Sequence, residues 1–341
     1  MACGMFVGTG MKKTAIMTTT RACSRSEAGF RKARLSVHRP RVQGFQCRSR
    51  VAGRCVLTTV AAVTPNTEFV CPAKLNTTPH ARDSRQMFYQ DASEAVVAAV
   101  ESPTISRCSM VLQIPETNIE GDVYRVGTLL ELARQMATGV IRSQKKKCVK
   151  LCVQQSLGEG IFTGLPLSLS GVRRLLEMLD FEDDVADYVK VGAVSEEEVD
   201  DECAAYIVLC PQNIVNGCVV PLLEEMTLAA EAKGQTVMIL NANLGDVPSS
   251  GGRMQVAGRK ERIAFAKSFT PIYHFRLLYQ KPFFYPIYGC IRMTVGERWG
   301  VFKKIGGTNV IRDPESYVLV DEFDKEPTPQ LITGSLMRKR E

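Results

Sequence analysis

The sequence predicts an α/β protein, with a mostly parallel sheet, helices on both faces, and an antiparallel C-terminal strand extension. Residues 204–209 and 236–240 are continuous apolar runs of strand length, and an apolar helical segment, 219–233, separates them. A strand–helix–strand unit of this kind places two parallel strands in one sheet and buries both of their faces. Earlier strand–helix pairs repeat the alternation, and from about residue 270 consecutive strands follow one another with only turns between them.

Helices are predicted where apolar residues recur at helical spacing, or where capping residues and acidic first turns mark a start. Ser170 can cap one of these helices, and Gly139 is expected to end another. The predicted helices cover 91–100, 124–138, 170–181, 219–233, 258–268 and 327–336.

Strands are predicted where short apolar or β-branched runs lie between prolines, glycines and polar turns. The predicted strands cover 107–114, 147–154, 187–191, 204–209, 236–240, 271–279, 285–294, 298–304 and 316–322. Together these elements predict a single α/β domain over 91–336, with the antiparallel extension beginning at about residue 270. A leader, 65–90, precedes the domain, and a charged tail, 337–341, follows it.

The first 64 residues differ from the rest of the chain in composition. They hold twelve basic side chains and a single acid, Glu27, and they are rich in Ser, Thr and Ala. This composition is typical of an organelle transit peptide, and its hydroxyl-rich character favours the chloroplast. A basic arm that binds RNA or anionic lipid is the alternative. The other 277 residues carry 35 acidic against 31 basic side chains, so no nucleic-acid partner is predicted.

No transmembrane segment is predicted, although peripheral membrane contact stays open. The best candidate is the uncharged stretch 203–223, which Pro211 and Pro221 interrupt. Its unbroken apolar part is far shorter than the ~20 residues that a spanning helix needs.

The cysteines predict no metal site, because no Cys-x-x-Cys pair occurs and the chain has three histidines. Cys148 and Cys152 share one face of a predicted strand, but about 13 Å of extended chain separates them, too far for a disulfide. Most cysteines after residue 64 are therefore expected to be small buried hydrophobes in a reducing stroma, and a thioredoxin-responsive pair is the alternative. These cysteines are Cys71, Cys108, Cys148, Cys152, Cys203, Cys210, Cys218 and Cys290.

Amide side chains follow three strands of the predicted parallel sheet. Ligands of such sheets bind beyond the carboxyl ends of the strands, so these amides predict a crevice for a polar ligand. The alternative is that they satisfy backbone groups of turns. The candidate ligand-binding residues are Gln155, Gln212, Asn213, Asn241 and Asn243. The acidic run 196–202 is expected to be a solvated loop rather than a metal or partner site.

No catalytic residue, cofactor or metal ligand is predicted. The sequence lacks Gly-x-x-x-x-Gly-Lys-Ser/Thr, Gly-x-Gly-x-x-Gly after a strand, and Gly-x-Ser-x-Gly. His274 follows a tyrosine in a predicted strand, where a structural role is expected. These observations favour a protein that is not an enzyme, and an enzyme is the alternative.

Residues 265–302 hold 11 of the 24 aromatic residues of the chain. Aromatic residues on strands are mostly core residues. A proline-flanked segment within this stretch is expected to be a loop, and exposed aromatic residues beside a cation suit a partner surface. The candidate partner-surface residues are Lys281, Phe283, Phe284 and Tyr285.

Four segments occur in an order that resembles one family. They are 207–213 (IVLCPQN), 237–244 (VMILNANL), 268–273 (SFTPIY) and 298–302 (RWGVF). Over residues 85–335 the chain resembles a domain of unknown function found in plastid and cyanobacterial proteins. That family includes the chloroplast low-photosystem-II-accumulation assembly factor and a copy appended to a plastid adenylate kinase. The chain has Ala242 where the family usually has proline.

The resemblance implies a stromal or thylakoid-associated protein and supplies no catalytic residues. The chain has no kinase P-loop, so phosphotransfer is not implied. The leading hypothesis is a non-enzymatic chloroplast auxiliary protein that acts by protein–protein interaction, in photosystem or thylakoid complex assembly. The alternative is an α/β protein, an enzyme or not, that binds a nucleotide or metabolite at the carboxyl ends of its strands.

Overall fold

The computed structural model describes ten segments, all within the unit formed by residues 61–341. They are 82–119, 124–145, 147–155, 167–179, 181, 184–214, 217–245, 258–279, 287–306 and 316–338. The predicted transit peptide, the predicted leader up to residue 81 and the last three residues lie outside the described residues. So do Cys71 and the candidate partner-surface residues Lys281, Phe283, Phe284 and Tyr285.

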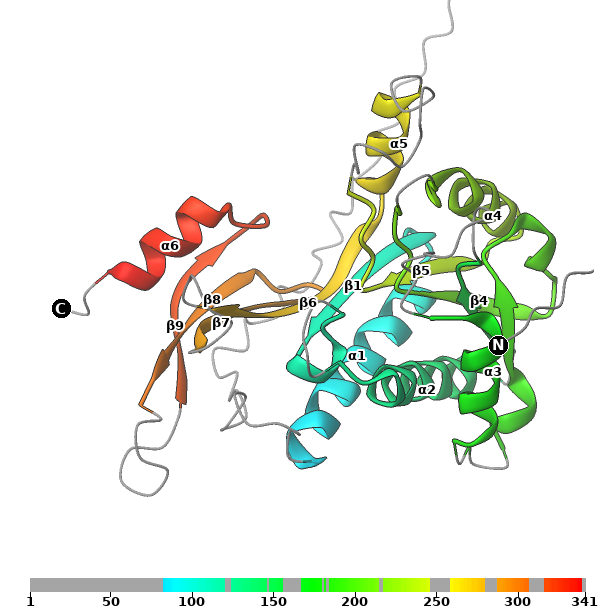
Figure 1. Ribbon diagram of the computed structural model, residues 1–341, viewed down its shortest axis with the longest axis horizontal. Coiled ribbons are helices and arrows are strands. Elements are labelled where there is room, and N and C mark those ends of the chain that lie inside the picture. The colour runs from blue at the N-terminus through cyan, green and yellow to red at the C-terminus, as the bar shows by residue number, and fades with distance from the viewer. Residues whose placement is uncertain are drawn as a thin grey trace, which may run out of the picture. The chain divides into compact units, whose positions relative to one another are not determined.

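A nine-stranded sheet forms the centre of this unit, with strand order β3-β2-β4-β5-β1-β6-β7-β8-β9 (Figure 1). The strands from β3 to β6 in this order are parallel, and β7, β8 and β9 continue the sheet in antiparallel fashion. The predicted fold class is therefore confirmed. The strands are β1 (Arg107–Gln113), β2 (Cys148–Val153), β3 (Val189–Ala193), β4 (Cys203–Leu209), β5 (Thr236–Leu240), β6 (Thr270–Tyr279), β7 (Ile287–Thr294), β8 (Trp299–Ile305) and β9 (Ser316–Phe323).

β6 joins the two parts of the sheet. It pairs in parallel with β1 and in antiparallel fashion with β7. The antiparallel pairing thus begins at the edge of β6 that faces away from β1.

The helices cover both faces of the parallel part (Figure 1). α1, α2 and α3 share one hydrophobic cluster with the sheet, whereas α4 and Phe265 of α5 belong to another. Alternation along β2 shows that the clusters lie on opposite faces, because Leu151 belongs to the first and Cys152 to the second. The helices are α1 (Arg82–Glu101), α2 (Val126–Ser143), α3 (Leu169–Glu177), α4 (Val220–Ala232), α5 (Arg259–Ala266) and α6 (Pro329–Met337).

α1 begins earlier than predicted, within the expected leader. Phe88 is fully buried, and its ring centroid lies 4.4 Å from that of Phe275 on β6. The apolar contact explains the longer helix, since burial of an aromatic side chain stabilises a polar segment that periodicity alone does not identify.

α2 continues through Gly139, where the sequence predicted its end. The position faces α1, and a side chain there would meet the hydroxyl of Ser93. Gly139 therefore serves the close approach of two helices rather than a helix end. α3 also differs slightly, because Ser168 caps it in place of Ser170, with its hydroxyl accepting a hydrogen bond from Gly171 N at 3.2 Å.

The connection between β3 and β4 contains no α-helix. It consists of a 3₁₀ turn, η3 (Glu196–Glu198), and the acidic residues that follow it. Two further 3₁₀ turns, η1 (Pro115–Thr117) and η2 (Ala186–Tyr188), lie in other connections. The acidic run consequently takes the place of a covering helix beside β2 and β4.

The C-terminal extension has its own apolar cluster, formed by one face of β7 and β8 with α6. Its buried members are Ile291, Met293, Trp299, Val301, Ile332 and Leu336. Most of the aromatic-rich stretch is core, as predicted, because these aromatic residues are buried: Phe265, Phe269, Tyr273, Phe275, Trp299 and Phe302.

His274 lies beside the extension, with its ring centroid 4.9 Å from that of Trp299. Burial, assisted by the charge of Arg276, lowers the pKa of His274 to about 3, so the ring is neutral at physiological pH. The position fits the structural role that the sequence predicted. Among the described residues, no helix combines the length and the apolar character that a membrane crossing requires.

Candidate functional site

Polar residues from two strand ends meet at the carboxyl edge of the parallel sheet. Gln212 and Asn243 form an isolated parallel bridge beyond β4 and β5. Asn213 N donates to Asn243 O at 3.0 Å, and Asn243 N donates to Pro211 O at 2.8 Å. The structure thus brings together three of the five predicted ligand-binding residues.

Asn241 directly follows β5 and is buried. Its side chain accepts from Leu112 N at 2.8 Å and donates to Leu112 O at 3.0 Å, which continues the pairing of β1 with β5 beyond the last paired residue. The backbone of Asn241 is left-handed, with φ of 48°, a conformation that asparagine tolerates better than most residues. The side-chain amide of Asn241 therefore holds the backbone of β1 next to β5 rather than facing a ligand.

Asn213 is likewise bonded to backbone groups. Its Oδ1 accepts from Val219 N at 3.1 Å, and its Nδ2 donates to Leu244 O and Gly245 O, each at 3.1 Å. These bonds fix the start of α4 against the chain that leaves β5. Gln155 is exposed.

Gln154, one residue before the predicted Gln155, has an environment that fits a ligand contact better than those of the predicted residues. The residue is 3% exposed, and its Oε1 accepts from Gln212 N at 2.9 Å. Its Nε2 is buried and has no hydrogen-bonding partner among the described residues. Gln154 lies where the strand order reverses. β2 and β4 are neighbours in the sheet, but the chain passes from β2 outward to β3 and from β4 in the opposite direction to β5. Ligands of open α/β sheets bind at such a reversal of strand order.

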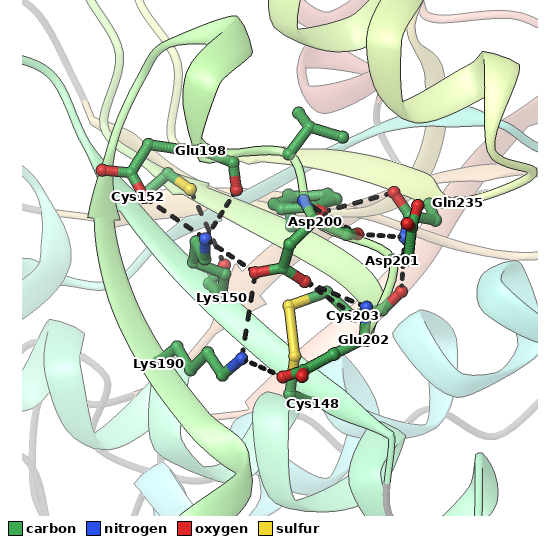
Figure 2. Close-up of polar contacts among 12 residues, drawn as sticks. Cys148, Lys150, Cys152, Lys190, Glu198, Asp200, Asp201, Glu202, Cys203 and Gln235 are labelled. Carbon is green, nitrogen blue, oxygen red and sulfur yellow. Dashed lines mark hydrogen bonds and ion pairs between the residues drawn. A yellow bond between two sulfur atoms is a disulfide. The ribbon is translucent and has the colours of Figure 1, made fainter.

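A second polar cluster lies along β2, nearer the amino edge of the sheet (Figure 2). Lys150 is in the middle of this strand and its side chain is 9% exposed. Its Nζ donates to Glu198 O at 2.5 Å and forms ion pairs with Glu198 Oε2 at 3.2 Å and Asp200 Oδ2 at 3.0 Å. Although desolvation by burial opposes it, hydrogen bonding from Lys150 to Asp200 and Glu198 leaves the pKa of Lys150 raised. Lys150 therefore remains charged.

Asp200 receives several further contacts. Lys190 Nζ lies 3.8 Å from Asp200 Oδ2, and Glu202 N and Cys203 N each donate to Asp200 Oδ1 at 3.1 Å. Burial raises the pKa of Asp200, but the Lys150 hydrogen bond and the lysine charges outweigh it and leave the pKa lowered. The carboxylate is therefore ionised.

Gln235 and Tyr206 fix the backbone of the same segment. Gln235 Nε2 donates to Asp200 O at 2.6 Å and to Cys203 O at 2.8 Å, and Tyr206 Oη donates to Asp200 O at 3.1 Å. The prediction of a solvated acidic loop is thus wrong for Glu198 and Asp200, which bind a buried lysine. It holds for the exposed residues Glu196, Glu197, Asp201 and Glu202.

Cys148 and Cys203 form a disulfide next to this cluster, visible below Asp200 in Figure 2. They are the first residues of β2 and β4 and are direct neighbours in the sheet. The expectation of reduced cysteines is therefore wrong for this pair. It is confirmed for four cysteines that are both buried and free: Cys108, Cys152, Cys210 and Cys290.

One sequence signal for this cluster was missed. Lys150 is the single charged residue in an otherwise apolar strand, Cys148–Val153. A lysine that a strand carries into the core needs a carboxylate partner. The acidic run 196–202 supplies it.

The comparison with protein families covers nearly the same residues as the described fold. Residues 82–333, most of the chain, match the model of a family described as domain of unknown function (DUF1995). The match begins at the first residue of α1 and ends within α6, so it includes both clusters and the antiparallel extension. The chain therefore belongs to the DUF1995 family.

Proposed function

We propose that the protein is a non-enzymatic chloroplast auxiliary protein that binds other proteins, in the assembly of photosystem or thylakoid complexes. The transit-type composition of residues 1–64 supports the compartment, and the resemblance to the low-photosystem-II-accumulation assembly factor supports the process. The observation that carries protein binding is the antiparallel extension with α6.

The extension holds most of the exposed large apolar residues that the structure describes. These are Val295, Ile305, Leu331 and Met337, against Leu175, Met178 and Leu228 elsewhere. Leu331 of α6 is 49% exposed although the opposite face of the helix is buried. The concentration of exposed apolar side chains in this part of the fold supports a partner-binding surface there.

β9 adds a second feature to this surface. It is the last strand of the sheet, and no strand among the described residues pairs with its outer edge. The backbone groups along this edge can accept an extended segment of a partner. Lys281 and the aromatic residues Phe283, Phe284 and Tyr285, in the connection from β6 to β7, remain the predicted further part of this surface.

The test is capture of partners from solubilised thylakoid membranes by the full chain. Leu331→Gln should lower the captured amount about fivefold, which corresponds to a loss of about 1 kcal/mol, the level that separates an interface anchor from the surrounding contacts. Leu228→Gln is the matched control, because Leu228 is 54% exposed on α4, and it should leave capture unchanged. Equal capture by both variants and by the triple Ser variant of Phe283, Phe284 and Tyr285 would reject this surface.

A second candidate function rests on Gln154. Its unpartnered Nε2 at the reversal of strand order favours a polar metabolite at the carboxyl edge. Gln155, Gln212, Asn213, Asn241 and Asn243 remain the predicted surroundings of that ligand.

Mass spectrometry of small molecules that co-purify with the native chain tests this candidate. A metabolite bound through Gln154 should be lost from a folded Gln154→Met variant, because methionine has similar length and no amide. Gln144→Met, at the end of α2, is the control that should retain it. A metabolite that stays bound in Gln154→Met, or none in the parent, argues against this function.

A further inference from the structure

We propose that the Cys148–Cys203 disulfide is a reversible redox site, which a dithiol reductant opens and which controls how firmly the segment 199–202 is held on the sheet. This inference goes beyond the proposed function and does not depend on it.

The pairing of Cys148 with Cys203 is selective. The structure describes five further cysteines, all unpaired, and one of them, Cys152, lies on the same face of β2. Burial raises the pKa of the Cys108 and Cys210 thiols to about 12, so neither supplies a competing thiolate at neutral pH. These two buried thiols therefore do not compete with the disulfide for exchange.

The sheet keeps the two cysteines opposite each other in either redox state. Their residues are direct partners in the β2–β4 ladder, with Cα atoms 4.3 Å apart. After an irregularity at Ala204, the ladder continues from Val149 and Ala205 up to Val153 and Leu209. Opening the disulfide leaves these backbone bonds in place, so the bond can form again without a change of fold.

The position at the amino edge of the sheet gives a route to the sulfur atoms. Cys148 and Cys203 are 5% and 2% exposed, but Lys147, Asp201 and Glu202 beside them are exposed. Cys148 N donates to Glu202 O at 3.2 Å, so the turn at 201–202 covers the bond. A reductant reaches the sulfurs when this turn opens locally, which requires no unfolding of a helix.

The exchange balances with a dithiol as the only co-reactant. One thiolate of the dithiol attacks a sulfur of the disulfide, which forms a mixed disulfide and releases the other cysteine as a thiolate. The second thiolate of the dithiol then attacks the mixed disulfide and releases the second cysteine. Two electrons pass to the protein, the dithiol leaves as a disulfide, and its two protons end on Cys148 and Cys203.

Asp200 couples the bond to the lysine cluster. A carboxylate oxygen of Asp200 and both sulfurs lie within 4.8 Å of one another, and Asp200 also accepts from Cys203 N. Lys150 and Lys190 both approach this carboxylate. Reduction removes the covalent link between the first residues of β2 and β4 and leaves two neutral thiols next to this carboxylate. Cys203 and Asp200 are then held less firmly, which weakens the bonds that hold the segment 199–202.

The test uses the oxidised full chain in mixtures of reduced and oxidised dithiothreitol, followed by alkylation and mass spectrometry. Cys148 and Cys203 should become alkylated together while circular dichroism remains unchanged. Hydrogen exchange of residues 199–203 should become at least about tenfold faster in the reduced chain, as local protection is lost.

Variants provide the controls for this test. Cys148→Ser should show the fast exchange without reductant, whereas Cys152→Ser should behave as the parent does. Alkylation of the pair only in parallel with global unfolding would overturn the proposal. Opening of the bond with unchanged hydrogen exchange over 199–203 would overturn it as well.

Discussion

Lys150→Met is expected to lower the free energy of unfolding by about 2–3 kcal/mol. Removal of one partner from a buried ion pair leaves uncompensated charge, which typically costs ~3–5 kcal/mol. The carboxylates of Glu198 and Asp200 are about one-third exposed, so water offsets part of that cost. Because methionine fills a similar volume, the decrease in the free energy of unfolding measures the contribution of the charge and hydrogen bonds of Lys150. Urea denaturation at pH 7.5 measures it.

Lys190→Met is the matched control for this experiment. Lys190 also contacts Asp200, but its side chain is 37% exposed and its closest partner, Glu202, is 77% exposed. Exposed pairs of this kind contribute roughly 0–1 kcal/mol. Equal losses in the two variants would show that the buried position of Lys150 has no special importance.

Asn241→Ala is expected to lower the free energy of unfolding by about 2–4 kcal/mol. The change leaves Leu112 N without its acceptor in the core, which costs ~1–3 kcal/mol. It also places alanine in a left-handed conformation, which costs a further ~1–2 kcal/mol. Thermal and urea unfolding measure the loss.

Two further variants separate these causes. Asn241→Gly removes the hydrogen bonds but relieves the backbone, so it should be more stable than Asn241→Ala by about 1 kcal/mol. Asn243→Ala, at an exposed position two residues later, should lie within about 0.5 kcal/mol of the parent. If Asn241→Ala matched Asn243→Ala, the side chain of Asn241 would not hold β1 and β5 together.

The role of Asn241 changes how ligand binding should be tested. An alanine at this position is expected to damage the sheet edge itself, so loss of a bound metabolite would not identify a ligand contact. Gln154 is the better position, because its Nε2 makes no bond among the described residues.

Much of the fold follows from local patterns in the sequence. Continuous apolar runs identify β4 and β5, and their separation by an apolar helix fixes a parallel pair. Proline-bounded and aromatic segments identify the strands of the extension in the same way. These signals are short-range, which explains why element types are predicted better than their ends.

The disulfide and the lysine cluster depend on contacts that local patterns do not contain. Cys148 and Cys203 meet because β4 lies beside β2, while β3, which precedes β4 in the chain, lies outside them. Asp200 contacts Lys150 because the connection from β3 to β4 passes over β2 and contains no α-helix. An acidic run has the same composition whether it faces water or a buried lysine, so its role depends on strand order.

The early start of α1 limits where the chain can be shortened by proteolysis. Phe88 and Tyr89 are buried, and Phe88 stacks on β6, the strand that joins both parts of the sheet. A mature protein cut within α1 would expose the fully buried Phe275 and lose the hydrogen bond from Tyr89 Oη to Thr128 O. Shortening of the chain from its amino end is therefore expected to preserve the described fold only if it spares Phe88 and Tyr89.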